Sequence, residues 1–248
     1  MTDDTTDFGF QQVPREEKAR RVGEVFSSVA GRYDLMNDLM SLGLHRLWKR
    51  QALHRMAPRP GQNWLDLAAG TGDLSRALRG RVGERGRVVA ADISAPMLAL
   101  GRDRLTDAGV VGNVDFVLAD AEQLPFADRR FDGVCIGFGL RNVTDKAAAL
   151  QEMARVIRPG GRLVVLEFSQ VYVPALRPLY DAYSLHVLPR LGQAVADDAD
   201  SYRYLAESIR VHPDQETLKG MLEEAGFEDC DHVNLSAGVV AIHSGFVY

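Results

Sequence analysis

The chain has 248 residues, of which 46% are hydrophobic and 25% are charged, as in an ordinary soluble globular protein. This composition excludes collagen-like, disordered and membrane-spanning chains, and no run of 18 apolar residues occurs. A formal net charge of −5 argues against attraction to a nucleic-acid backbone. Cys135 and Cys230 are too few for a disulfide framework or a zinc site. The start lacks the features of a signal peptide, so we expect a cytoplasmic protein.

The first quarter of the chain is expected to be mainly helical. The ten N-terminal residues look loosely ordered, whereas apolar residues between Pro14 and about Met56 have the spacing of a helical face. Polar residues interrupt the stretch from Tyr33 to Leu44, which is compatible with a broken helix or a structured loop. Prolines and a glycine at 58–61 end this segment.

Apolar runs and helical stretches alternate regularly after Gly61. Such alternation predicts βαβ units and a parallel sheet with right-handed crossovers. The predicted strands are Trp64–Ala69, Val88–Ala91, Val114–Leu118, Phe131–Ile136 and Leu163–Phe168, and the predicted helices between them are Leu74–Arg79, Pro96–Ala108 and Lys146–Ile157.

The last third of the chain is expected to have two parts. From Val171 to about Ile209 an aromatic-rich pattern predicts helices. Phe227–Leu235 and Val239–Tyr248 predict two strands that form a hairpin at the sheet edge. We therefore expect one domain, with residues 1–60 as an N-terminal helical extension and residues 61–248 as an α/β domain carrying a helical insertion at about 171–210.

A glycine-containing loop follows the first predicted strand and opens a helix. Gly70 and Gly72 let the backbone turn tightly and approach a ligand, and the helix start offers unpaired N–H groups. Asp92, twenty residues past Gly72 at the end of the second strand, can accept both hydroxyls of a ribose. The alternative is that the glycines only make a tight turn between strand and helix.

Acidic residues around this loop indicate the charge of its ligand. Asp66 lies before the loop and Asp73 after it, and two carboxylates would repel a pyrophosphate. Ser75 also stands where the dinucleotide fingerprint G-x-G-x-x-G requires its third glycine. The loop therefore suits a ligand with positive charge, such as the sulfonium of S-adenosylmethionine, and does not suit NAD.

The third predicted strand ends close to Asp120 and Ala121. A carboxylate there can bond an adenine amino group while the backbone N–H that follows meets a ring nitrogen, because open α/β sheets bind ligands at this edge. The alternative is that Asp120 caps a short helix. With Asp92 on the preceding strand, we favour the ligand.

Longer stretches of the chain resemble known families. Asp66–Ser75, Asp92, Asp120–Ala121 and the turn Arg158–Gly161 look like motifs of class I S-adenosylmethionine-dependent methyltransferases. A narrower resemblance, to the UbiE/MenG family, covers nearly the whole chain. It rests on Val25–Ala30, Tyr33–Asp38, Ser41–Lys49, Phe138–Val143, Arg155–Ser169 and Asp198–Leu205.

This resemblance implies a Rossmann-like α/β fold, with a mostly parallel seven-stranded sheet, an antiparallel last strand and helices on both faces. It implies S-adenosylmethionine as cofactor, bound by Thr71, Asp92, Asp120 and Ala121 in addition to the loop residues above, and a substrate side formed by residues 1–60. Gly137 stands where family members commonly carry serine, so no side-chain contact with the cofactor is expected there.

The activity implied by the resemblance is methylation of a quinol ring carbon, from demethylmenaquinol to menaquinol and on the 2-methoxy-6-polyprenyl-1,4-benzoquinol precursor of ubiquinone. A ring carbon becomes nucleophilic when a neighbouring phenol is ionised, so the site must align the ring and remove or stabilise a phenol proton. We expect Arg141 to hold the oxyanion or orient a water and Asn142 to orient the ring. The alternative for Arg141 is a salt bridge with a nearby acid such as Asp145.

Two further residues are candidates for the substrate pocket. Tyr33 and His45 both lie in stretches that carry the resemblance, although Tyr33 would equally serve as a packed aromatic residue. The remaining histidines show no ligand spacing and are expected to be structural, so no metal site is predicted.

A prenylated quinol requires an apolar groove or a membrane for its tail. Tyr172–Leu191 is a candidate wall or lid for such a groove. The basic stretch from His45 to Arg59 is compatible with peripheral contact at the inner face of a membrane. A solvated helix face is the blander interpretation of that stretch. A homo-oligomer or a quinone-biosynthesis complex is also compatible with the sequence, whereas nucleic acid is not an expected partner.

Two other functions stay open at this point. The chain could bind the cofactor as a non-catalytic member of a quinone-biosynthesis assembly, or it could methylate another phenolic or lipid acceptor. Arg141 and Asn142 beside an intact cofactor loop argue against the first, and the long similar segments argue against the second.

Overall fold

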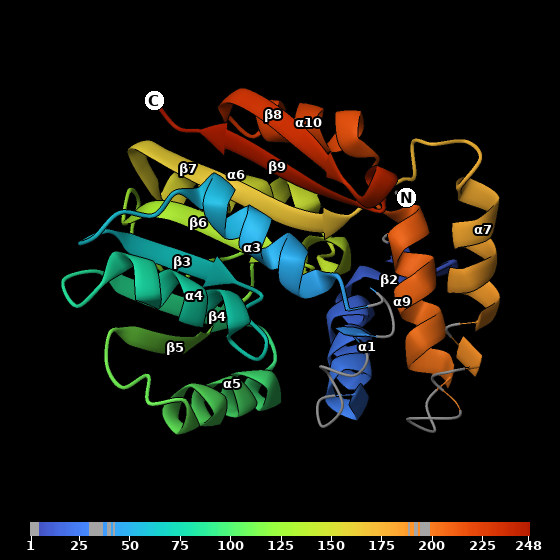
Figure 1. Ribbon diagram of the computed structural model, residues 1–248, viewed down its shortest axis with the longest axis horizontal. Coiled ribbons are helices and arrows are strands. Elements are labelled where there is room, and N and C mark those ends of the chain that lie inside the picture. The colour runs from blue at the N-terminus through green and yellow to red at the C-terminus, as the bar shows by residue number, and fades with distance from the viewer. Residues whose placement is uncertain are drawn as a thin grey trace.

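The computed structural model describes residues 5–29, 37, 38, 41, 43–187, 189, 190, 193 and 199–248. Its described residues build a seven-stranded sheet in the order β5-β4-β3-β6-β7-β9-β8 (Figure 1). The last strand, β9, runs antiparallel to both of its neighbours, and the β3–β4, β3–β6, β4–β5 and β6–β7 pairs are parallel. The strands are β3 Asn63–Leu67, β4 Arg87–Asp92, β5 Val114–Leu118, β6 Phe131–Gly137, β7 Ile157–Phe168, β8 Glu228–Leu235 and β9 Val240–Phe246.

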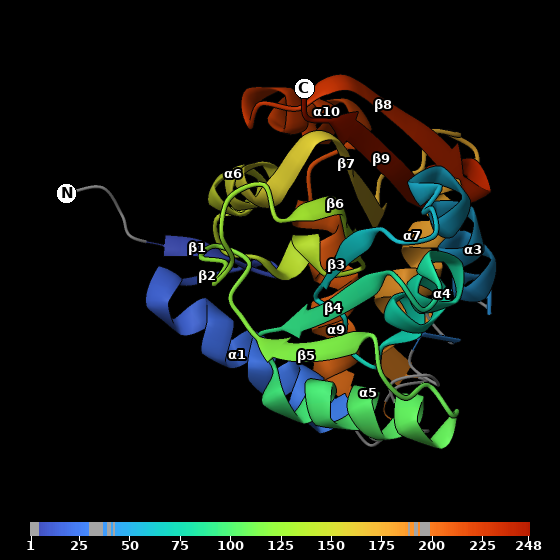
Figure 2. The ribbon, with the colours of Figure 1, turned by 90° about the vertical axis from the view of Figure 1, so that its left-hand side faces the viewer.

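Side chains that alternate along each strand divide the core between the two faces of the sheet. Trp64 of β3 faces one way, whereas Leu65 and Leu67 face the other, because successive side chains of a strand point to opposite sides. Figure 2 shows the sheet between these layers. The Trp64 face carries α3 His45–Met56 and α4 Asp73–Val82, and the Leu65 face carries α6 Lys146–Val156 and α10 Gln215–Glu224. A further helix, α5 Ala95–Asp107, packs on β4 and β5.

Several helices begin where a side chain caps the first turn. Ser94 accepts a hydrogen bond from the Met97 N–H before α5, and Asp145 accepts one from the Ala148 N–H before α6. Such caps satisfy N–H groups that have no partner inside the helix. They fix the loops that leave β4 and β6, the two strands whose ends carry Asp92 and Gly137.

The N-terminus is ordered where it is described, so the expectation of a loose start is wrong for residues 5–10. They belong to a hairpin of β1 Thr5–Phe8 and β2 Gln11–Pro14, which leads into α1 Arg15–Val29. The ring of Phe8 stacks on Tyr204 of α9 Ala199–Val211, with centroids 4.2 Å apart. This contact spans nearly 200 residues, which is why a local pattern did not predict it.

The C-terminal part confirms the predicted hairpin at the sheet edge, with β8 outermost and a turn at Ser236–Gly238. Helices α7 Arg177–Ala182, η3 Tyr183–Val187 and α9 occupy the predicted helical region, whereas α10 was not predicted. Strand β7 also starts six residues earlier than predicted, at Ile157. In Figure 1, α1, α9 and α7 stand together beyond the carboxyl ends of the central strands. No described helix is long and apolar enough to cross a membrane.

Candidate functional site

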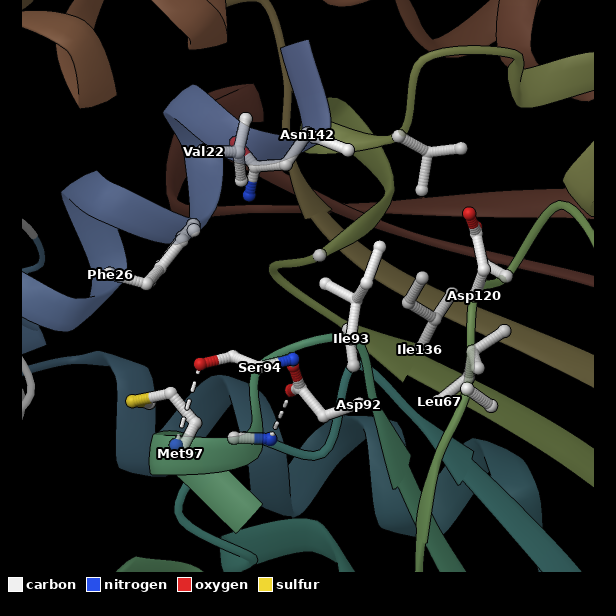
Figure 3. Close-up of a pocket in the computed structure, with 18 of the residues that line it drawn as sticks. Val22, Phe26, Leu67, Asp92, Ile93, Ser94, Met97, Asp120, Ile136 and Asn142 are labelled. Atoms are coloured by element: carbon white, nitrogen blue, oxygen red, sulfur yellow. Dashed lines mark hydrogen bonds between the residues drawn. The ribbon is translucent and has the colours of Figure 1, made fainter. Parts of the chain in front are cut away.

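An open cavity of about 860 Å³, its mouth included, lies at the carboxyl ends of β3, β4, β5 and β6 (Figure 3). This is the edge where the strand order reverses and where open α/β sheets bind ligands. Leu67, Ile136 and Met97 make much of its floor apolar, and Val22 and Phe26 of α1 form a wall that faces them. Residues far apart in the sequence therefore enclose one space.

Asp92 is held rigidly at the end of β4. Its carboxylate accepts hydrogen bonds from the Gly70 N–H and the Ser94 N–H, each at 2.8 Å, and only 9% of the residue is exposed. Burial raises the pKa of the Asp92 carboxyl group, and these backbone hydrogen bonds counteract it. Each oxygen keeps a lone pair for a ligand hydroxyl, as the sequence predicted for a ribose.

Asp120 and Ala121 line the cavity beside Asp92, at the end of the neighbouring strand. The Asp120 carboxylate accepts a hydrogen bond from the Glu122 N–H at 2.9 Å, and residues 120–123 form a turn closed by a bridge to Gln123. No helix begins there, so the alternative of a helix cap is wrong. Ala121 in this turn lines the cavity, and its small side chain leaves room for a flat ring such as adenine.

The charge of the cavity matches the cofactor that the sequence predicted. Its described lining contains three carboxylates, Asp92, Asp120 and Glu122, and no lysine, arginine or histidine. A negative, largely apolar cavity favours a cationic ligand and disfavours a pyrophosphate. The residues present therefore fit S-adenosylmethionine, whose sulfonium is cationic.

A second, polar cavity of about 320 Å³, its opening to solvent included, adjoins the first and shares Ala68, Gly137 and Phe138 with it. Lys49 of α3 reaches its edge and pairs with Asp73, Nζ to Oδ2 2.6 Å. Asp66 and Thr71 also line it. Opposite charges side by side suit the ammonium and carboxylate of an amino-acid tail.

Asp66 is completely buried at the end of β3. It accepts hydrogen bonds from Ser75 Oγ at 2.6 Å and Cys135 Sγ at 3.5 Å, and burial raises the pKa of its carboxyl group to about 6. At the position where a dinucleotide site needs glycine, Ser75 therefore donates a hydrogen bond that holds the Asp66 carboxylate. In the free protein Asp66 is therefore mostly neutral below about pH 6. A ligand ammonium is stabilised by the ionised carboxylate, so ligand binding favours loss of this proton.

The affinity for S-adenosylmethionine is expected to rise about tenfold between about pH 5 and about pH 7, because binding below pH 6 must first remove the Asp66 proton. Burial also raises the pKa of the Asp92 carboxyl group, so its titration would change the affinity in the same direction. Calorimetric titration at several pH values measures it, and Asp66→Asn should remove the part of the rise that comes from Asp66. An affinity of the wild-type protein that is flat over this range would contradict the expectation.

Some residues of the glycine loop line the cavities, whereas one only shapes the turn. Gly70 lines the main cavity and Thr71 the second one, whereas Gly72 lines neither. Gly72 has φ +81°, and a Cβ there would lie 2.8 Å from Leu105, so it serves the turn. At Gly137 a Cβ would meet Leu74 at 2.7 Å, which shows what occupies the place of the serine side chain.

Arg141 is buried and committed to protein partners. Its Nη1 pairs with Glu167 Oε1 at 2.7 Å and donates to the Phe138 carbonyl at 2.5 Å, and the guanidinium lies over the Phe168 ring. Arg141 is not among the described residues that line either cavity. The acid that pairs with it is Glu167 and not Asp145, which caps α6 instead.

Asn142, by contrast, lines the main cavity, and its Oδ1 accepts a hydrogen bond from the Tyr204 hydroxyl at 3.0 Å. His45 lies at the start of α3, 4% exposed, with Nε2 2.9 Å from Asp38 Oδ1, and it lines neither cavity. Tyr33 lies outside the described residues. The structure thus brings Asn142 to the residues predicted to bind the cofactor and leaves Arg141 and His45 outside both cavities.

Sequence reasoning missed two features of the site. Lys49 was not predicted as a site residue, and its closeness to Asp73 depends on how α3 packs on α4. Ala68 and Phe138, which line both cavities, have left-handed backbones at φ +53° and +59°. Such strain in residues other than glycine gathers at functional sites, and no sequence signal marks it.

Comparison with known families gives one match over almost the whole chain. Residues 13–247 match the ubiE/COQ5 methyltransferase family. A ubiquinone/menaquinone biosynthesis C-methyltransferase of Proteus mirabilis is 59% identical over 245 residues, covering 99% of this chain and 98% of the relative. Proteins with that name from Escherichia coli O139:H28 and Vibrio cholerae are 60% and 59% identical over 99% of this chain, and over 98% and 94% of their own lengths.

Solved structures resemble the chain in fold. A crystal structure of a SAM-dependent methyltransferase of Thermotoga maritima, a possible histamine N-methyltransferase, has a TM-score of 0.65 at 20% identity, covering 91% of this chain and 99% of its own. The [4+2]-cyclase SpnF reaches 0.69 at 19% identity, over 92% and 96%. At this identity the likeness concerns the fold alone, and these two neighbours carry different chemistries on it.

Proposed function

The chain belongs to the ubiE/COQ5 methyltransferase family, and on this premise we propose that it methylates a ring carbon of prenylated quinols. S-adenosylmethionine is the methyl donor. The acceptors proposed are demethylmenaquinol and the 2-methoxy-6-polyprenyl-1,4-benzoquinol precursor of ubiquinone, in line with the names of relatives that are about 60% identical, which are ubiquinone/menaquinone biosynthesis C-methyltransferases. The observation that carries the proposal is one cavity with the cofactor-binding acids at one end and Asn142, beneath an apolar α1 wall, at the other.

When bound, S-adenosylmethionine supplies an electrophilic methyl group. The chain then has to hold the acceptor carbon in line with that group and keep water out. Val22 and Phe26 give the acceptor end an apolar wall against which a ring can pack. The carbon gains the methyl group and loses its hydrogen as a proton, and a phenolate oxygen beside it makes the carbon nucleophilic.

Asn142 is the side chain proposed to meet the acceptor oxygen, since it is the polar group at that end of the cavity that the sequence also predicted. An amide donor stabilises a phenolate without being ionised itself. Direct contact of Arg141 with the oxyanion stays a prediction, and it requires the guanidinium to leave Glu167. In the described arrangement Arg141 instead anchors the loop that presents Asn142, through the Phe138 carbonyl.

The N-terminal segment and the tail of the acceptor remain part of this proposal. Residues of α1 form the acceptor wall, which supports placing residues 1–60 on the substrate side of a domain formed by 61–248. Peripheral membrane contact is proposed through exposed Leu44 and Leu47 near the start of α3. Arg46 and Arg55 on that helix are paired with Asp38 and Asp231, so less free basic charge remains than the sequence indicated.

The proposal predicts turnover that depends on the redox state of the acceptor. Purified protein, S-adenosylmethionine and a short-chain demethylmenaquinol kept reduced under argon should give the methylated ring, detected by mass spectrometry. The matching quinone should give none, because it has no phenol to ionise. Equal product from both forms would contradict the mechanism. No product with intact cofactor binding would favour another acceptor or a non-catalytic partner.

A further inference from the structure

Tyr204 lies in the stretch Asp198–Leu205, one of the segments that resemble the UbiE/MenG family. It sits on α9, 5% exposed, and its ring stacks on Phe8 of the N-terminal hairpin. Its hydroxyl lies 3.0 Å from Asn142 Oδ1. Tyr204 thereby connects the hairpin, α9 and a side chain of the cavity.

The hydrogen bond between Tyr204 and Asn142 has one satisfactory direction. A phenol has a single hydrogen, and a buried donor without an acceptor is costly. Burial raises the pKa of the Tyr204 phenol, so this hydrogen stays in place at neutral pH. The phenol therefore donates to the Asn142 carbonyl oxygen, and the amide NH₂ faces the opposite way. In Figure 3 the amide nitrogen of Asn142 points toward the interior of the cavity.

The loop around Asn142 is held from several sides. The Val143 carbonyl accepts hydrogen bonds from Lys18 Nζ at 3.2 Å and Lys146 Nζ at 3.3 Å. The Thr144 N–H donates to Glu122 Oε1 at 2.9 Å. The backbone next to Asn142 is therefore held in place, and its side-chain amide is held by the hydrogen bond from the Tyr204 hydroxyl.

We propose that Tyr204 is a positioning residue for the acceptor, which fixes the Asn142 amide so that its NH₂ donates to the ionised oxygen of the quinol ring. The Phe8 stack keeps the Tyr204 ring in place and makes the N-terminal hairpin part of the acceptor site. Without the phenol, the amide can turn its oxygen toward the phenolate and repel it. This inference rests on the proposed function. It adds the residue that decides whether the Asn142 amide presents its NH₂ or its oxygen to the acceptor.

The test is a double-mutant cycle of Tyr204→Phe and Asn142→Ala with reduced short-chain demethylmenaquinol. Tyr204→Phe keeps the ring and its stack on Phe8, and it should lower kcat about tenfold while the Kd for S-adenosylmethionine stays within about twofold. In the Asn142→Ala background the same change should have no further effect, because the group that it positions is gone. Tyr248→Phe removes a surface hydrogen bond to Asp229 and serves as the matched control, with unchanged kcat.

Asn142→Asp gives an independent readout that does not depend on Tyr204→Phe folding. An aspartate can accept the same hydrogen bond but presents a carboxylate oxygen to the phenolate, so its kcat should fall below that of Asn142→Ala. The inference is overturned if Tyr204→Phe leaves kcat unchanged, if its loss is the same in both backgrounds, or if Asn142→Asp is as active as Asn142→Ala. Wild-type protein that methylates no quinol would instead overturn the proposed function.

Discussion

Replacing Glu167 with alanine is expected to lower the free energy of unfolding by about 3–5 kcal/mol, the usual cost of breaking a buried ion pair by removing one partner. Glu167 is 1% exposed, and its two oxygens accept from Arg141 Nη1, the Arg141 N–H and the Phe168 N–H. The variant leaves a buried guanidinium without a counter-charge and two backbone donors without an acceptor. Urea unfolding followed by circular dichroism measures the loss.

Two variants accompany this measurement. Asp200→Ala breaks an exposed ion pair with Arg203 and should cost less than about 1 kcal/mol. Glu167→Leu combined with Arg141→Met replaces the pair with apolar side chains and should recover much of the stability. If the double variant is stable but turns over no quinol, the pair has a functional role as well. A Glu167→Ala protein within about 1 kcal/mol of wild type would show that the pair is not structurally important.

Asp92→Ala is expected to weaken binding of S-adenosylmethionine by at least about a hundredfold. Two hydrogen bonds from ribose hydroxyls to a carboxylate contribute about 1.5–3 kcal/mol each, and about 1.4 kcal/mol corresponds to a factor of ten. The substitution also removes the acceptor that holds the Gly70 and Ser94 N–H groups. Isothermal titration calorimetry at neutral pH measures the affinity.

The control for Asp92 lies on the adjacent strand. Asp115→Ala removes a carboxylate that is paired with Arg87, away from the cavity, and should leave the affinity unchanged. Asp92→Asn keeps the volume but only one acceptor oxygen, so its loss should be intermediate. An Asp92→Ala protein that binds S-adenosylmethionine within about threefold of wild type would show that Asp92 does not hold the cofactor.

Most of the fold was predictable because its signals are local. The alternation of apolar runs and helices placed the parallel strands, and strand β5 Val114–Leu118 has the predicted bounds. What could not be predicted depends on long-range contact. The hairpin at Thr5–Pro14 rests on α9, and β7 extends back to Ile157 because it pairs there with Phe131. Neither partner is visible in a short window of sequence.

Some site residues could likewise be placed from the sequence, and others depend on long-range contacts. Asp92 and Ala121 line the cavity because strand ends in a parallel sheet converge on one edge, which the strand assignment already implies. The place of Arg141 could not be inferred in that way. Whether an arginine after β6 faces the cavity or the core depends on Glu167, which lies 26 residues later on β7. The role of Tyr204 likewise depends on the packing of α9 against the loop after β6.

The most direct test of the central claim is where the methyl group arrives. Reduced short-chain demethylmenaquinol and S-adenosylmethionine carrying a trideuterated methyl group would be incubated with the protein under argon, and the product would be located by mass spectrometry and NMR. We expect one CD₃ group on a ring carbon, with loss of that carbon's hydrogen. A CD₃ group on a ring oxygen, or no transfer although the cofactor is bound, would contradict it.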